Sequence, residues 1–278
     1  MIRLIAVDLD GTLLAPDKSL SDHNRLALHQ ANALGIKIVI CTGRPYLAAQ
    51  PVLDQLGLKS AEDYLITFNG GQIHRASDGQ VIYRQALDFS DFLIWQKELE
   101  RLQLPWHPVD EEWVYQAPKE DSPFPSIYVS QVTTAPAKTK DYQLFGPDNY
   151  FLKFVVATDQ EYLLQQLEQL KPELADQYAI VHSHPFQIEI SKAGVSKGNA
   201  LARLGRRLQI PPEEMLTIGD QANDASMIKM AGIGVAMGNA AAEVKAQADY
   251  VTASNQDNGV AKAIYHLLNI RRGNHGII

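Results

Sequence analysis

The strongest chemical signal in the sequence is a pair of aspartates, Asp8 and Asp10, just after a short apolar block. In an extended segment the side chains of residues i and i+2 project the same way, so we expect the two carboxylates to face one spot. Two carboxylates held that close repel each other, and a bound divalent cation is one way to keep both ionised. Gly11 would then allow a tight turn that brings backbone N–H groups close to an anion. The alternative is a strand-end turn in which the acids only cap and solvate the chain.

A second segment could hold phosphate. Thr42 and Gly43 follow another apolar block, and a hydroxyl, a glycine amide and the start of a helix together make a phosphate cradle. The same pattern also occurs in ordinary turns. Arg44, the next residue, would either bind substrate or lie in solvent at the start of the helix. Cys41 is expected to be a small core residue without a chemical role.

Two more segments carry charged side chains at predicted helix starts. Lys197 stands in a first helical turn, where the helix dipole disfavours a cation, so it should have an anionic partner elsewhere unless it is a solvated surface lysine. Asp220 could ligate a cation, while one helical turn would carry Asn223 and Asp224 towards the same pocket. Roles as turn and cap residues would account for one acid but not for three polar groups. Together, the acids, the hydroxyl and the lysine suit Mg²⁺ and phosphate, and no Cys/His cluster indicates zinc.

The elements that must position these residues alternate between strand and helix. In the first third, strands are expected at residues 2–7, 36–40 and 64–68, with helices at 21–34 and from Pro45 onward. In the last third, helices are expected at residues 196–208, 223–231 and 240–248, and strands at 215–218, 233–236 and 250–252. This alternation predicts a parallel sheet with crossover helices, whose strand ends gather at one edge and form the ligand site.

The middle of the chain has a different character. Residues 87–189 are rich in aromatic residues and proline, and segments such as 186–190 alternate polar and apolar residues. Such alternation predicts an antiparallel sheet with one solvated face. We therefore expect an α/β protein with a doubly wound, Rossmann-like parallel-sheet core at residues 1–86 and 190–278. An inserted α+β domain at residues 87–189 would split this core.

Composition narrows the class of protein. The chain has 278 residues, 46% hydrophobic and 21% charged, which is typical of a globular protein and excludes an intrinsically disordered one. No uncharged apolar run approaches the ~18 residues of a spanning helix, and the first apolar block is too short for a signal-peptide core. With a single cysteine, these features predict a cytoplasmic protein. The net charge of −7 indicates that neither nucleic acid nor a membrane is the main partner, and the oligomeric state cannot be read from the sequence.

A family resemblance rests on four motifs, whose order and spacing are similar to those of the haloacid dehalogenase-like phosphatases: residues 8–12, 42–44, Lys197 and 219–224. Residues 68–71, which read Phe-Asn-Gly-Gly, and the long insertion that follows resemble the Cof-type hydrolases with a large α/β cap, especially their sugar phosphatases. The resemblance extends from residue 2 to about residue 268. Residues 269–278 carry no recognisable motif.

The resemblance implies Mg²⁺-dependent hydrolysis of small phosphorylated metabolites, with sugar phosphates as the expected class. Asp8 would attack phosphorus and become an aspartyl phosphate, and Asp10 would protonate the leaving alcohol and then activate water. Mg²⁺ would be held by the carboxylates of Asp8 and Asp220 and by the backbone carbonyl of Asp10. Asp224 would support either the ion or Lys197, and whether it ligates the metal directly is left open.

The resemblance also implies which residues hold the phosphate. Thr42, Gly43 and the backbone amide of Leu9 would bind it, and Lys197 would offset its charge during transfer, so that Thr42 and Lys197 count among the catalytic residues. Asn223 would contact the phosphate or orient the site. The inserted domain would cover the site and contact the leaving group. Its aromatic side chains are compatible with sugars, nucleotides or cofactor phosphates, and most of them are expected to be core residues.

Two other functions remain open at this point. A phosphomutase or phosphotransferase would use the same aspartyl phosphate but pass the phosphoryl group to a sugar hydroxyl instead of water. A phosphorylatable receiver module, which acts in regulation, also places acids, a hydroxyl and a lysine at the strand ends of a parallel sheet. Receivers are compact single domains, however, whereas here a long insertion separates the two parts of the sheet.

Overall fold

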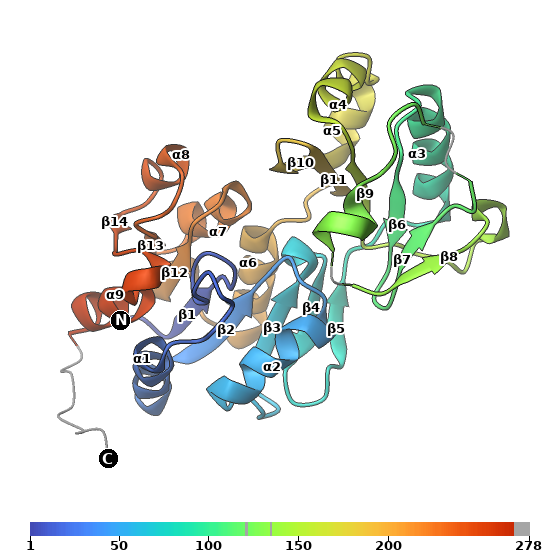
Figure 1. Ribbon diagram of the computed structural model, residues 1–278. Coiled ribbons are helices and arrows are strands. Elements are labelled where there is room, and N and C mark those ends of the chain that lie inside the picture. The colour runs from blue at the N-terminus through green and yellow to red at the C-terminus, as the bar shows by residue number, and fades with distance from the viewer. Residues whose placement is uncertain (120–121, 134, 270–278) are drawn as a thin grey trace. The chain divides into compact units, whose positions relative to one another are not determined.

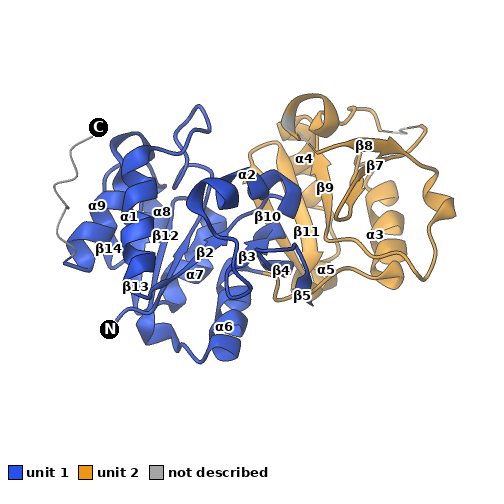
Figure 2. Ribbon diagram, turned by 90° about the horizontal axis from the view of Figure 1, so that it is seen from below, with its two compact units in different colours: residues 1–83, 196–278 blue, residues 84–195 orange. Residues whose placement is uncertain are grey.

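The computed structural model describes residues 1–119, 122–133 and 135–269 (Figure 1). The chain forms two compact units, one of Met1–Tyr83 with Ser196–Ile278 and one of Arg84–Val195 (Figure 2). We call the first the core unit and the second the inserted unit. The divisions lie a few residues from the predicted borders at 86/87 and 189/190, because strand β11 (Gln187–Lys192) runs on past residue 190 in the inserted unit. Residues 270–278, most of the segment without a recognisable motif, lie outside the described residues.

The core unit is built on an eight-stranded sheet with the order β14-β13-β12-β1-β2-β3-β4-β5. Its strands are β1 (Leu4–Val7), β2 (Lys37–Cys41), β3 (Tyr64–Thr67), β4 (Gln72–Arg75), β5 (Val81–Arg84), β12 (Met215–Gly219), β13 (Ile233–Ala236) and β14 (Tyr250–Val251). From β14 to β3 every neighbouring pair is parallel, and β4 turns back antiparallel to β3. The N-terminal strand β1 lies between β2 and β12, so the two halves of the unit meet at its carboxyl end.

Helices cover both faces of the core sheet. They are α1 (Asp22–Ala33), α2 (Tyr46–Leu56), α6 (Lys197–Leu208), α7 (Ala225–Met230), α8 (Ala242–Lys245) and α9 (Gly259–Leu267). Ile5 and Val7 of β1 belong to one apolar cluster with α1, α2, α8 and α9, whereas Leu4 and Ala6 belong to another with α6 and α7. Because β1 is buried on both sides, its residues are apolar throughout instead of alternating.

The main differences from the expected elements of the core unit fall near its C-terminal end. The helix expected at 223–231 is divided into a 3₁₀ turn, η5 (Ala222–Asp224), and the short α7, because Gln221 and Asp224 cap each other's backbone at its start. The helix expected at 240–248 shrinks to α8, since the bond from Ala248 N to Lys245 O closes a tight turn there. The other predicted core elements agree to within about two residues at each end.

The inserted unit contains a six-stranded sheet with the order β10-β11-β9-β6-β7-β8. Its elements are α3 (Phe89–Arg101), β6 (His107–Val109), β7 (Val114–Gln116), the π-helix η2 (Tyr128–Val132), β8 (Ala137–Thr139), η3 (Tyr142–Leu144), β9 (Lys153–Ala157), α4 (Gln160–Leu167), α5 (Pro172–Gln177), β10 (Tyr178–His184) and β11. The strand pairs are antiparallel as expected, except that β7 and β8 run parallel. Phe154 and Ile190 face an apolar cluster that includes Trp95, whereas Lys153 and Glu189 form an ion pair outside this cluster. The face with this ion pair also carries Val155, which is fully buried, and Lys153 and Glu189 are only 12% and 15% exposed, so the expected solvated face is largely covered at these strands.

Two sequence expectations about individual residues are confirmed. Trp95, Trp106 and Tyr115 are buried in the apolar cluster of the inserted unit. Cys41 is buried at the end of β2, and burial raises the pKa of its thiol, which suits a core residue without a chemical role. Among the described residues, no helix is long and apolar enough to cross a membrane.

One close backbone contact fixes where α6 begins. Gly70, at the end of the 3₁₀ turn η1 (Phe68–Gly70), has a φ of +104°, and a Cβ atom there would lie 2.2 Å from the carbonyl oxygen of Ser196. Ser196 is the N-cap of α6, and its side chain accepts a hydrogen bond from Asn199 N. Glycine at position 70 therefore allows the start of α6, and with it Lys197, to approach the end of β3.

We expect Gly70→Ala to lower the free energy of unfolding by about 3 kcal/mol, because alanine would add both a strained φ and a steric clash. Gly35→Ala is the matched control: its φ is +83°, but a Cβ atom there would have no neighbour within 4 Å. The control should lose only about 1 kcal/mol, the cost of the backbone conformation. Urea denaturation of both variants measures the difference, and equal losses would show that the contact with Ser196 is not limiting.

Candidate active site

The site begins where β1 ends. The backbone N–H of Asp8 still continues the ladder to β12, donating to Ile218 O at 3.0 Å. The chain then turns, with Leu14 N donating to Leu9 O at 2.9 Å. Gly11 has a φ of +81°, and a Cβ atom there would lie 2.3 Å from Asp220 Oδ2. The glycine predicted to make a tight turn therefore also makes room for the carboxylate that follows β12.

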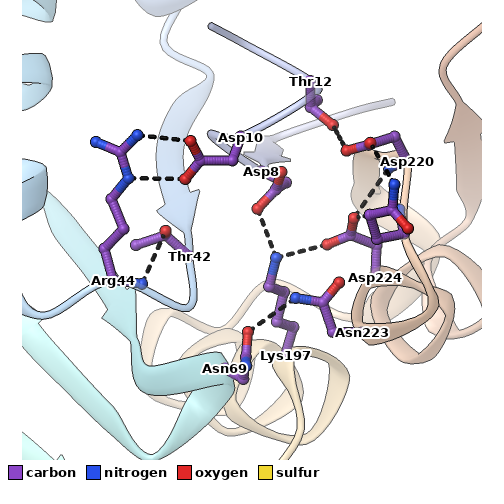
Figure 3. A network of polar contacts seen from close by, with 11 residues as sticks. Asp8, Asp10, Thr12, Thr42, Arg44, Asn69, Lys197, Asp220, Asn223 and Asp224 are labelled. Atoms are coloured by element: carbon purple, nitrogen blue, oxygen red, sulfur yellow. Dashed lines mark hydrogen bonds and ion pairs between the residues drawn. The ribbon is translucent and has the colours of Figure 1, made fainter. Parts of the chain in front are cut away.

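Lys197 lies at the centre of the site. Its Nζ donates to Asp8 Oδ1 and to Asp224 Oδ1, both at 2.6 Å, and its side chain has no exposed surface (Figure 3). Burial alone would lower the pKa of Lys197, but Asp224 and Asp8 outweigh it and hold the pKa above its ordinary value. The lysine expected to need an anionic partner thus has two, which compensate for its position in the first turn of α6.

Three buried aspartates form the acidic part of the site. Asp8, Asp220 and Asp224 each offer a carboxylate oxygen within 4.8 Å of the others. Burial raises the pKa of Asp8 to about 8, although Lys197 opposes the shift. Burial also raises the pKa of Asp220, opposed by a hydrogen bond from the hydroxyl of Thr12. Oxygen ligands of this kind fit a hard divalent cation, which would favour the charged carboxylates.

The hydrogen bonds distinguish the roles of Asp224 and Asp220. Both oxygens of Asp224 are engaged, Oδ1 by Lys197 and Oδ2 by the backbone N–H groups of Asp220 and Gln221, at 2.9 and 3.0 Å. Asp220 Oδ1 accepts a hydrogen bond from Thr12 Oγ1 at 2.7 Å. Asp224 therefore holds Lys197 and the loop that carries Asp220, which fits a supporting role better than direct metal ligation.

The side chain of Asp10 does not point where its spacing from Asp8 predicts. Its side chain does not join the group of Asp8, Asp220 and Asp224 but accepts hydrogen bonds from Arg44 and Lys18. The expectation that Asp8 and Asp10 face one spot is therefore wrong, because the i, i+2 rule holds for a strand and the chain is already turning at Leu9. Burial alone would raise the pKa of Asp10, but Arg44 and Lys18 hold it below its ordinary value.

The predicted phosphate-binding segment lies at the end of β2. Thr42 is buried, its backbone N–H donates to Ile66 O at 2.8 Å, and its hydroxyl accepts a hydrogen bond from Arg44 N at 3.1 Å. Leu9, whose backbone amide was expected to bind phosphate, has a fully buried side chain. Arg44 is not a solvated arginine, because it is half-buried and forms an ion pair with Asp10. This contact was not predicted.

A second unpredicted residue is Asn69. Its Oδ1 accepts a hydrogen bond from Asn223 Nδ2 at 2.9 Å, and a Cβ atom on Gly43 would lie 3.0 Å from the same oxygen. Asn69 therefore connects the segment after β3 with those after β2 and β12. The sequence signal was the Phe-Asn-Gly-Gly segment at residues 68–71, which indicated the family but not this contact; in the structure Asn69 has a φ of +55°.

Comparison with known proteins decides the family. A family model described as haloacid dehalogenase-like hydrolase matches residues 5–264. The chain belongs to the haloacid dehalogenase-like hydrolase family. It is 34% identical to the 5-amino-6-(5-phospho-D-ribitylamino)uracil phosphatase YcsE of Bacillus subtilis (strain 168), and the match covers 95% of each chain. It is 32% identical to phosphatase YwpJ of the same organism, and this match covers 96% of this chain and 100% of the other. The solved structure of the HAD subclass IIB sugar phosphatase BT4131 superposes with a TM-score of 0.75 and 26% identity, covering 96% of this chain and 100% of that chain.

These comparisons confirm the expected family, the α/β fold class and the class of enzyme. The protein is a phosphoric monoester hydrolase of the haloacid dehalogenase-like family. A receiver-like regulatory module does not agree with these findings.

The contact geometry predicts that Lys197→Met lowers the free energy of unfolding by about 3–5 kcal/mol in the presence of a chelator, because Asp8 and Asp224 would face each other as unpaired buried charges. Lys262→Met is the control, since it removes the same charge from an exposed position on α9 and should change stability little. Urea denaturation of both variants provides the measurement. Similar stabilities would contradict the assignment of Lys197 as the buried counter-charge.

Proposed function

We propose that this chain is a Mg²⁺-dependent phosphatase that hydrolyses phosphate monoesters of small metabolites through an aspartyl phosphate on Asp8. The observation that carries the proposal is the buried contact of Lys197 with Asp8 and Asp224, next to Asp220. Such a group combines a carboxylate nucleophile, a fixed positive charge and oxygen ligands in one place. We expect sugar phosphates as the substrate class, which the similarity to the sugar phosphatase BT4131 supports. We also expect the protein to be located in the cytoplasm.

Asp8 would supply the nucleophile. Lys197 holds Oδ1 of its carboxylate, and Oδ2 would attack phosphorus as the bond from phosphorus to the alcohol oxygen breaks. The phosphoryl group would then be attached to Asp8 as a mixed anhydride, and the first product would leave as an alcohol. A covalent intermediate of this kind divides one difficult displacement into two easier ones.

Asp10 would carry the proton. It would donate a proton to the leaving alcohol oxygen, and its carboxylate would then take one from the water molecule that hydrolyses the aspartyl phosphate. For this step its carboxyl group must leave Arg44 and Lys18, which hold both of its oxygens in the present structure. The proposed role of Asp10 therefore requires a change of its ion pairs.

The carboxylates of Asp8 and Asp220, with the backbone carbonyl of Asp10, would hold Mg²⁺. When bound, the ion would offset the negative charge of the phosphate and of these carboxylates. Asp224 would keep Lys197 and the loop of Asp220 in place. The protein residues alone leave an excess of negative charge around Lys197, so a phosphate dianion would otherwise be repelled.

The phosphate oxygens would be bound by backbone and side-chain donors at the ends of β1 and β2. Thr42, Gly43 and the amide of Leu9 would contribute these contacts, and Asn223 would act together with Asn69. The inserted unit would serve as a cap that contacts the leaving group and excludes water. Release of inorganic phosphate into water, without transfer to an added sugar, distinguishes this hydrolase from a phosphomutase or phosphotransferase.

Asp8→Asn should lower the rate of hydrolysis of an aryl phosphate by about 10³-fold or more, because an amide cannot act as the nucleophile. The change is nearly isosteric, so the circular dichroism spectrum should be preserved. Asp176→Asn, a matched change at an exposed position of α5, should retain full activity. Mass spectrometry of acid-quenched protein should find the phosphoryl group on Asp8, and a phosphoryl group on another residue would contradict the mechanism.

Removal of divalent cations should abolish turnover, because Asp8 and Asp220 would repel the phosphate without a counter-charge. Phosphate release is measured after dialysis against chelator and again after addition of Mg²⁺, which should restore it. Ca²⁺ should support less turnover, since its larger and looser coordination suits in-line transfer poorly. Full activity in excess chelator would refute the metal assignment while leaving the covalent mechanism to be judged by the Asp8 variant.

A further inference from the structure

Two cations meet at the carboxylate of Asp10. Arg44 donates from Nε to Oδ2 at 2.7 Å and from Nη2 to Oδ1 at 2.6 Å, and Lys18 Nζ donates to the same Oδ1 at 2.7 Å. We call Arg44 and Lys18 the cation pair. Two parallel bonds from a guanidinium group to a carboxylate are the geometry by which arginine recognises carboxylate and phosphate groups.

The backbone holds both members of the cation pair in place. Arg44 N donates to the hydroxyl of Thr42, in the segment proposed to bind phosphate. Lys18 lies in a tight turn in which its N–H donates to Ala15 O at 2.9 Å, and its φ is +67°. A lysine in this left-handed conformation is strained, and such residues are concentrated at functional sites. The positions of the two cations therefore depend on local backbone structure as well as on Asp10.

The cation pair differs from Lys197 in its exposure to solvent. The side chains of Arg44, Asp10 and Lys18 are 26%, 40% and 62% exposed, whereas that of Lys197 is 0% exposed. The ion pair of Lys18 is weak because water screens it at such an accessible position, whereas the two parallel bonds of Arg44 are stronger. Another anion that accepts the same bonds can take the place of the carboxylate. The pair also carries two positive charges against the single charge of Asp10, in a chain whose net charge is −7. Both cations are therefore accessible to solvent, and Asp8 also acts electrostatically on Arg44, which places the pair near the phosphoryl-transfer residues.

The proposed proton transfer would separate Asp10 from the cation pair. Asp10 must leave the cation pair to reach the leaving oxygen, and two cations without a partner would then remain. An anionic group of the substrate can take its place, because it would accept the same hydrogen bonds from Arg44 and Lys18.

We propose that Arg44 and Lys18 bind a second anionic group, a carboxylate or a second phosphate, on the phosphorylated substrate, and that its binding releases Asp10 for proton transfer. This inference rests on the proposed function, because it assumes a phosphate at Asp8 and an acid/base role for Asp10. It narrows the substrate class to phosphate esters that carry a further negative charge, such as phosphorylated sugar acids or bisphosphates. Arg44 and Lys18 are then specificity-determining residues.

Binding of phosphonates tests the inference without depending on turnover, because their phosphorus–carbon bond is not hydrolysed. The affinities of phosphonoacetate, 3-phosphonopropionate and 4-phosphonobutyrate are measured by calorimetry in the presence of Mg²⁺. Each is compared with an uncharged partner of the same length: ethyl-, propyl- and butylphosphonate. In the unmodified protein, at least one carboxylated compound should bind roughly tenfold more tightly than its partner. Lys18→Met and Arg44→Met should each reduce this preference to nearly one.

Lys59→Met provides the matched control. Lys59 is 65% exposed and pairs with Asp54 at 3.0 Å, so it resembles Lys18 in exposure and in partner, and its variant should keep the preference. The inference is overturned if no carboxylated compound is preferred over its partner, if none of the six compounds binds, or if the preference survives in both variants. Phosphate release from esters is measured separately. Failure of the unmodified protein to hydrolyse any ester with Mg²⁺ would reject the proposed function, whereas hydrolysis without the preference would reject only this inference.

Discussion

The arrangement of the core unit depends on the buried ammonium group of Lys197. It joins Asp8 and Asp224, which lie 189 and 27 positions away in the chain, and none of the three side chains could be buried as a charge without the others. The start of α6 must therefore lie at the carboxyl edge of the sheet. Close contacts permit this position: Gly70 meets Ser196, and Gly198 donates its N–H to the hydroxyl of Ser226. Gly70 and Gly198 thus allow the close packing that the buried ion pairs of Lys197 require.

The sheet topology explains why three distant segments supply one site. With β1 between β2 and β12, the chain leaves these three neighbouring strands at the same edge, so the segments that begin at Asp8, Thr42 and Asp220 are brought together. The residues with proposed chemical roles all belong to the core unit. Chemistry and the proposed recognition of the leaving group are thus assigned to separately built parts of the chain.

Electrostatics divides the acids of the site into two groups. Asp8 and Asp220 lie in a buried environment that raises their pKa values, whereas Asp10 lies at a more accessible position where Arg44 and Lys18 lower its pKa. Asp8 and Asp10, which are close in sequence, are therefore prepared for different tasks, and Asp220 shares the environment of Asp8. Asp8 and Asp220 gain from a cation, and Asp10 must exchange partners before it can transfer a proton.

The sequence alone determined the strands and helices next to the four motifs, but it did not indicate β4, β5 or α9. Apolar blocks and helical spacing predicted β1, β13 and α6 well because they report the burial of consecutive residues, and the motif order indicated the family. Only the tertiary structure decided the partners of Lys197, the contact of Asn69 with Asn223, and the displacement of Asp10 towards Arg44. Sequence spacing describes side-chain direction within a regular strand or helix. These contacts arise instead where loops bring distant residues together, so their geometry depends on the whole fold.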